Sequence, residues 1–88
     1  MQKATGAYEI VFASGKNYVG KGGFGRAIDS AFEHARDNKD KVISICWKKS
    51  ENNRMAFIDE FIMQTKRGVN NSTTYNLRWS PGRRYCGY

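Results

Sequence analysis

The stretch from residue 6 to residue 22 constrains the fold of this chain more than any other. It reads as a short apolar strand, a polar turn around Gly15, and a second strand that ends in glycines. Two strand-like runs joined by such a turn are typical of a β-hairpin. Tyr8 and Tyr18 stand in the two strands, and a hairpin can bring such positions side by side on one face. We therefore expect a hairpin that carries two tyrosines.

Residues after the hairpin favour a helix. We place the two strands at 8–13 and 17–20, and the glycine cluster at 22–25 separates them from a helical pattern over 26–36. In that pattern apolar residues recur at helical spacing, which predicts one buried stripe. The stripe consists of Phe24, Ile28, Ala31, Phe32 and Ala35.

The second half of the chain adds a strand, a helix and a tail. Residues 42–47 are apolar enough to form a central strand of a sheet. A helical pattern then begins at Asn53 and ends before Gly68. The stretch 69–88, with its Pro81-Gly82 turn signal, favours an ordered loop. The order β-β-α-β-α predicts a small α+β fold, with a three-stranded antiparallel sheet flanked by two helices.

Length and charge limit the function. Eighty-eight residues make one domain, 1–88, and no apolar run approaches the roughly 18 residues of a membrane helix. We expect a monomer that does not bind membranes. The net charge is +7, and every acidic residue lies at or before Glu60. The remaining segment interleaves bases with rings, which favours nucleic acid as a partner, with an acidic protein as the alternative. These residues are Lys66, Arg67, Tyr75, Arg78, Trp79, Arg83, Arg84, Tyr85 and Tyr88.

Two patterns suggest chemistry that the rest of the chain does not support. Cys46, in the apolar run 42–47, is expected to be buried, and Cys86 to be exposed; two cysteines so far apart form neither a disulfide framework nor a zinc site. Gly20, Gly22 and Gly25 match a dinucleotide-binding pattern. That fold needs repeated βαβ units, for which this chain has no room.

The hairpin tyrosines belong to two short motifs, Gly6-Ala7-Tyr8 and Tyr18-Val19-Gly20. Arg26 follows at the start of the first helix, and Glu60 ends the run Ala56-Phe57-Ile58-Asp59-Glu60 in the second. The pair Tyr75-Asn76 comes after both helices. The order and spacing of these motifs, over about residues 6 to 80, resembles the GIY-YIG nuclease family, with Ala7 and Val19 as mild departures.

This resemblance implies a metal-dependent endonuclease that hydrolyses phosphodiester bonds of DNA or RNA with one Mg²⁺ or Mn²⁺ ion. Glu60 would hold the metal, Arg26 would clamp the phosphate, and Asn76 would support the site. Tyr8 or Tyr18 would assist deprotonation of the attacking water. Asp59 leaves the metal ligand open by one position, because adjacent helical residues point about 100° apart and only one can face the tyrosines.

Other side chains are candidates for substrate contact. His34 lies on the same helix as Arg26 and could contact phosphate or transfer a proton. Basic and aromatic residues could contact the phosphates and bases of the substrate. We assign this role to Lys16, Lys21, Arg78, Trp79, Arg83 and Arg84.

The tail Tyr75-Asn76-x-x-Trp79-Ser80-Pro81-Gly82 also resembles the nuclease domains at the C-termini of bacterial polymorphic toxins. That resemblance implies an antibacterial effector, exported as part of a larger protein, which acts in the cytoplasm of a target bacterial cell. It also implies an acidic immunity protein as a partner.

Two other functions are compatible with the residues. A non-catalytic nucleic-acid-binding module would use the basic tail alone. A metal-independent ribonuclease would use His34, with a tyrosine or lysine, for acid–base work on a 2′-hydroxyl.

Overall fold

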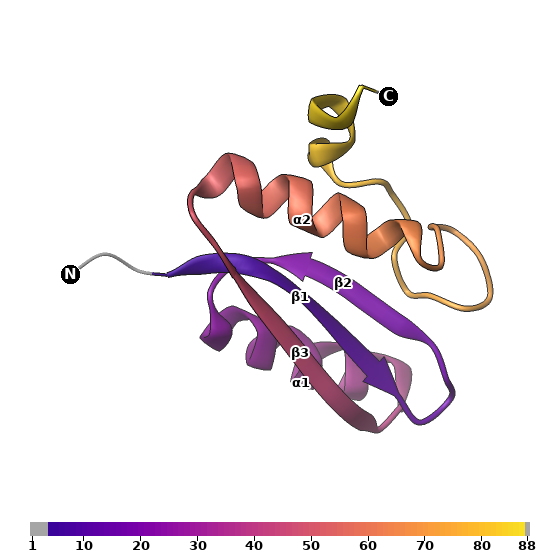
Figure 1. Ribbon diagram of the computed structural model, residues 1–88. Coiled ribbons are helices and arrows are strands. Elements are labelled where there is room, and N and C mark those ends of the chain that lie inside the picture. The colour runs from indigo at the N-terminus through magenta and orange to yellow at the C-terminus, as the bar shows by residue number, and fades with distance from the viewer. Residues whose placement is uncertain (1–3, 88) are drawn as a thin grey trace.

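A three-stranded antiparallel sheet lies between two helices in the computed structural model, which describes residues 4–87 (Figure 1). This confirms the predicted α+β fold. Tyr88, the last aromatic residue of the tail, lies outside the described residues. The elements are β1 (Thr5–Phe12), β2 (Asn17–Lys21), α1 (Phe24–Asn38), β3 (Val42–Ser50), α2 (Asn53–Thr65) and a short 3₁₀ helix (Pro81–Cys86).

The hairpin forms as predicted, and one glycine allows its tyrosines to share a face. Tyr8 pairs with Gly20 across the antiparallel strands, and Ile10 pairs with Tyr18. A Cβ atom at Gly20 would overlap the hydroxyl and ring of Tyr8, so the bare backbone at this position makes room for that ring. Tyr8 and Tyr18 therefore lie on the same face, with their ring centres 6.5 Å apart.

The middle of the sheet belongs to β1, not to the strand at 42–47, and the prediction of a central strand there was wrong. The strand order is β2-β1-β3, so β3 is an edge strand. Helices cover both faces of β1, and Ala7, Tyr8 and Ile10 are at most 2% exposed. In β3, Ile43 and Cys46 are exposed, and the hydrogen bonds that join this strand to α2 are donated by Lys48 and Ser50 at its far end.

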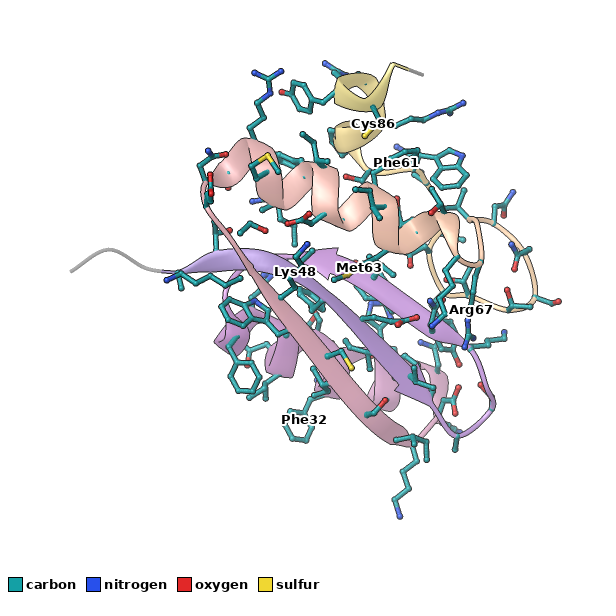
Figure 2. The ribbon with its side chains drawn as sticks, viewed as in Figure 1. Phe32, Lys48, Phe61, Met63, Arg67 and Cys86 are labelled. Atoms are coloured by element: carbon teal, nitrogen blue, oxygen red, sulfur yellow. The ribbon has the colours of Figure 1, made fainter. Side chains whose placement is uncertain are left out.

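On one face of the sheet, small residues let α1 pack closely. Ala27 and Ala31 are buried against Tyr8, Ile10 and Phe12 of β1. The predicted stripe was therefore wrong for its two largest members, Phe24 and Phe32. Phe24 is 53% exposed and lies at the margin against Trp47, while Phe32 is 71% exposed (Figure 2).

The second helix, α2, covers the other face. Ala56 is fully buried there, as are Ala7 of β1 and Val19 of β2. The helix begins at Asn53, as predicted, because the Asn52 side chain accepts a hydrogen bond from the Met55 amide at 2.9 Å.

The C-terminal segment closes the outer edge of β2. Thr74 forms a parallel bridge with Asn17, and the Tyr75 amide donates to the Asn17 carbonyl at 2.7 Å. The segment then crosses to α2, where Gly82 lies so close to the Phe57 carbonyl that a Cβ atom would overlap it. The predicted ordered loop is present, with this bridge and the short 3₁₀ helix as additions.

Both cysteines are exposed and free. The prediction was right for Cys86, which lies on the 3₁₀ helix (Figure 2), and wrong for Cys46. Cys46 lies opposite Glu9 on the α2 face of β3, at a place that α2 does not cover. Within residues 4–87, no helix combines the length and the apolar character that crossing a bilayer requires.

Substituting two glycines by alanine tests the contact between Tyr8 and Gly20. We expect Gly20→Ala to lower the free energy of unfolding by about 1–3 kcal/mol, because the Tyr8 ring must move. Gly25→Ala is the matched control: no atom would lie within 4 Å of its Cβ atom, and alanine in α1 should stabilise the helix by up to about 1 kcal/mol. Urea unfolding of both variants measures the difference, and equal effects would contradict the packing argument.

Candidate active site

A cleft of about 430 Å³ opens at the β2 edge of the sheet, between α1, α2 and the C-terminal segment. Its lining includes five polar side chains that are candidates for binding or catalysis: Tyr18, His34, Glu60, Asn76 and Ser80. The remaining lining residues are Val19, Gln64, Tyr75, Leu77, Arg78, Trp79 and Pro81. Because both faces of the sheet border the cleft at this edge, side chains from two different helices meet there.

Glu60 is the carboxylate of this cleft, and Asp59 is not. Asp59 turns toward β3, where it accepts hydrogen bonds from Ser50 Oγ at 2.7 Å and from Lys48 Nζ at 3.4 Å. Glu60 Oε1 accepts from Ser80 Oγ at 2.6 Å. Burial raises the pKa of Glu60, and the Ser80 hydrogen bond and the nearby Lys21 oppose that shift. The result is a partly desolvated carboxylate that a cation would stabilise.

The two tyrosines differ in access to the cleft. Tyr8 is 2% exposed, and its hydroxyl is 2.7 Å from Ser30 Oγ, behind Tyr18. Tyr18 lines the cleft itself. Burial raises the pKa of Tyr8, and it is also the main cause that raises the pKa of Tyr18, to which Tyr8 and Glu60 add. The charge of Arg26 lowers both pKa values in part. The net shift of each pKa is still upward, so both phenols are protonated at neutral pH.

Arg26 lies on the first turn of α1, exposed, with its side chain over Gly22. It does not line the cleft, but its charge acts on Tyr8 and Tyr18. The predicted group of Tyr8, Tyr18, Arg26 and Glu60 is therefore brought into one neighbourhood, in which Tyr18 and Glu60 are the members that face the open space.

His34 sits in a stack of rings. Its ring centre is 4.0 Å from that of Tyr18 and 6.0 Å from that of Tyr75. Burial lowers the pKa of His34, although Asp37 and Glu33 oppose the shift. His34 is thus a neutral imidazole at neutral pH, beside the cleft and able to accept a proton.

The Asn76 side chain pairs with the edge of β2 in the way that a neighbouring strand would. Its Oδ1 accepts from the Val19 amide at 2.7 Å, and its Nδ2 donates to the Val19 carbonyl at 2.8 Å. The carboxamide thereby pairs with both backbone groups of Val19, between Tyr18 and Gly20. Its role in this structure is to hold the cleft wall against the tyrosine motif.

The residues predicted to contact substrate fall into four places. Arg78 and Trp79 line the cleft, and Arg83 and Arg84 line an adjoining hollow of about 360 Å³ that shares Trp79, Ser80 and Pro81 with it. Lys21 is the last residue of β2, and its Nζ reaches the start of α2, where it donates to Asn53 Oδ1 at 2.8 Å. Lys16 lies on the β1–β2 turn, with its ammonium 5.0 Å from the centre of the Tyr75 ring.

Sequence reasoning missed two side chains that shape the cleft. Ser80 accepts from the Gly82 amide, donates to Glu60, and caps the 3₁₀ helix; a serine before a proline at a helix start is a recognisable capping signal. Tyr75 covers His34 and donates to Asp40 Oδ2 at 2.6 Å. The Ser14 and Tyr75 hydrogen bonds hold the pKa of Asp40 below its usual value. No local pattern predicts that long-range contact.

In comparisons with known proteins, no family model, no curated protein and no solved structure matched this chain. A partly buried carboxylate, a neutral imidazole and a tyrosine hydroxyl face one cleft, with cationic side chains along its rim. Such a set can bind a polarising cation and an anionic substrate, and can transfer a proton.

NMR titration tests the environment of His34, which is the only histidine in the sequence. We expect its pKa to lie below 6.5 in the folded protein and near 6.5 in urea. Because the unfolded chain then binds this proton more readily, the free energy of unfolding should fall as the pH drops below about 6.5. A folded-state pKa at or above 6.5 would show that the ring stack leaves the imidazole in contact with water.

Proposed function

We propose that this protein is a metal-dependent endonuclease of the GIY-YIG type, which hydrolyses phosphodiester bonds in DNA or RNA. The observation that best supports this is the meeting of Tyr18 and Glu60 in one cleft, with Tyr8 behind Tyr18 and the charge of Arg26 acting on both tyrosines. These residues come from β1, β2, α1 and α2, so only the fold could bring them together. They are also the residues on which the sequence resemblance rests.

A divalent metal site with one protein ligand is compatible with the cleft. Within residues 4–87, no group of three or more His, Cys, Asp or Glu side chains could hold a metal. Mg²⁺ nevertheless binds through one or two carboxylates, since it keeps several waters and takes phosphate oxygens as ligands. Glu60 fits that role, because it is partly buried and is held by Ser80. The bound ion would neutralise phosphate charge and polarise a water molecule.

His34 is a better proton acceptor than either tyrosine. Burial raises the pKa of Tyr8 and of Tyr18, so neither phenol gives up its proton readily. Burial lowers the pKa of His34, which leaves the imidazole neutral and able to accept. In this mechanism His34 accepts the proton from the attacking water. The hydroxyl of Tyr18 orients that water or the phosphate. Arg26, whose charge acts on Tyr8 and Tyr18, contributes positive charge toward the scissile phosphate.

The neutral imidazole also favours a second candidate, a metal-independent ribonuclease in which His34 deprotonates a 2′-hydroxyl. The toxin and immunity-protein assignment extends the main proposal, and its support is the sequence resemblance together with the net charge of +7, which suits an acidic partner.

Incubation of the purified chain with DNA and with RNA, each with Mg²⁺ and with EDTA, separates these functions. We expect cleavage that requires the metal. Cleavage of RNA alone that survives EDTA would favour the ribonuclease. Binding of either polymer without any cleavage would favour the non-catalytic module.

The substitution Glu60→Gln separates metal binding from folding. We expect the cleavage rate to fall about a thousandfold, since loss of the metal removes several kcal/mol of transition-state stabilisation. The folded state raises the pKa of Glu60, so its contribution to stability is present at low pH and is lost as the pH rises through that pKa. A neutral glutamine should therefore leave thermal stability at neutral pH unchanged or higher.

The matched control is Glu51→Gln, which removes one exposed carboxylate just before α2. It should leave cleavage unchanged. Cleavage assays and thermal unfolding at neutral pH measure both variants. Full activity in Glu60→Gln would remove Glu60 from the proposed mechanism.

A further inference from the structure

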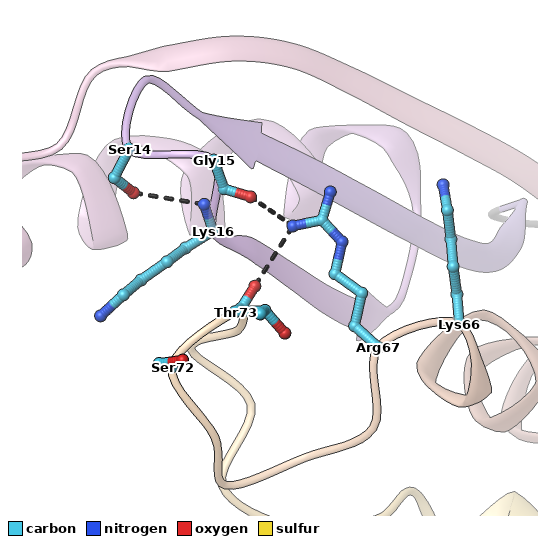
Figure 3. Close-up of a pocket in the computed structure, with 7 residues that line it drawn as sticks. All are labelled: Ser14, Gly15, Lys16, Lys66, Arg67, Ser72 and Thr73. Atoms are coloured by element: carbon cyan, nitrogen blue, oxygen red, sulfur yellow. Dashed lines mark hydrogen bonds between the residues drawn. The ribbon is translucent and has the colours of Figure 1, made fainter.

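A second hollow, of about 530 Å³, lies beyond the active-site cleft, where the β1–β2 turn meets the end of α2 (Figure 3). We call it the basic hollow. Three of its seven lining residues carry positive charge and none carries negative charge. Its lining consists of Ser14, Gly15, Lys16, Lys66, Arg67, Ser72 and Thr73.

Arg67 lies between the two lysines of the basic hollow and is held by two hydrogen bonds (Figure 3). Its Nη1 donates to the carbonyl of Gly15 and, at 3.2 Å, to the carbonyl of Thr73. These bonds tie the hairpin turn to the loop after α2 and use only one nitrogen of the guanidinium. The other nitrogens have no partner among the hydrogen bonds of residues 4–87 and can donate to an oxyanion.

The lysines flank Arg67 instead of converging on one point. Figure 3 shows the Lys16 and Lys66 side chains extending on either side of it. Lys66 has a weak partner in Glu9, at 3.7 Å, and its side chain remains 66% exposed. Cations spread in this way suit successive phosphates of a strand better than a single small anion.

Lys16 links the basic hollow to the active-site cleft. Lys16 lines the hollow, and its ammonium lies over the Tyr75 ring, which lines the cleft. On the far side, the cleft shares Trp79, Ser80 and Pro81 with the hollow of Arg83 and Arg84. Cations and half-buried rings thus continue on both sides of Glu60.

We infer that the basic hollow is a second phosphodiester-binding subsite, through which a polynucleotide strand passes by way of Lys16 and Tyr75 into the cleft. The course of the strand past Glu60 rests on the proposed nuclease function; the binding of phosphates by Lys16, Lys66 and Arg67 does not. The ligand is a strand of nucleic acid, not free phosphate or a mononucleotide.

The double variant Lys16→Gln/Lys66→Gln tests the subsite and leaves the structural Arg67 in place. The probe is a fluorescently labelled single strand of about 12 nucleotides, as DNA and as RNA, titrated in EDTA so that no metal-dependent cleavage occurs. We expect weaker binding and a salt dependence whose slope is smaller by about 1 for each phosphate that the variant no longer binds. Binding of a dinucleotide should weaken less than binding of the strand, because a dinucleotide cannot span the basic hollow and the cleft together.

The matched control is Lys41→Gln/Lys49→Gln, which removes the same charge from exposed lysines at the β3 edge. Equal weakening by the two double variants would overturn the subsite, since net charge alone would then explain the effect. Competition by inorganic phosphate at the concentration of the strand, or preference for an acidic peptide over the strand, would also overturn it.

Amide chemical shifts of the unmodified chain give a test that does not depend on the variants folding. On addition of the strand, the amides of Lys16, Arg67 and Thr73 should shift, and those of Lys41 and Lys49 should not. Selective weakening with no cleavage of DNA or RNA under any condition would support the subsite and refute the nuclease. Cleavage without selective weakening of strand binding would support the nuclease and refute the subsite.

Discussion

The pairing of the Asn76 carboxamide with the backbone of Val19 is the interaction on which the site depends. A strand at the edge of a sheet exposes backbone donors and acceptors, and here one side chain satisfies both groups of a buried residue. The pairing fixes the C-terminal segment along β2. Tyr75 is then placed over His34, and Ser80 against Glu60. Without it, the cleft would lose one wall.

Burial, more than charge, sets the protonation of the groups in that cleft. It is the largest cause of the raised pKa values of Tyr8, Tyr18 and Glu60 and of the lowered pKa of His34. Each shift favours the neutral form, which is the expected response of ionisable groups moved away from water. A cation bound at Glu60, or a phosphate beside Arg26, would change this balance, so the site is suited to a charged ligand.

The sequence predicted most of the residues of the candidate site, but few of the contacts that position them. Motif order named Tyr18, Glu60 and Asn76, and His34 was a further candidate on the helix of Arg26; all four line one cleft. Which of Asp59 and Glu60 lines the cleft depends on which side of α2 meets β3, and there Ser50 and Lys48 bind Asp59. The contribution of Tyr75 depends on a contact with Asp40, 35 residues away in the chain. Local patterns carry no information about such partners.

By itself, the sequence determined the hairpin, the start of the second helix and the α+β class, because turns, caps and periodicity act over a few residues. The tertiary structure decided which strand is central and which apolar residues stay exposed. Residues 42–47 have the composition of a buried strand, yet β3 (Val42–Ser50) lies at an edge, because β1 pairs with both other strands and both helices cover it. Burial is a property of what packs against a residue, and the chain must fold before that neighbour exists.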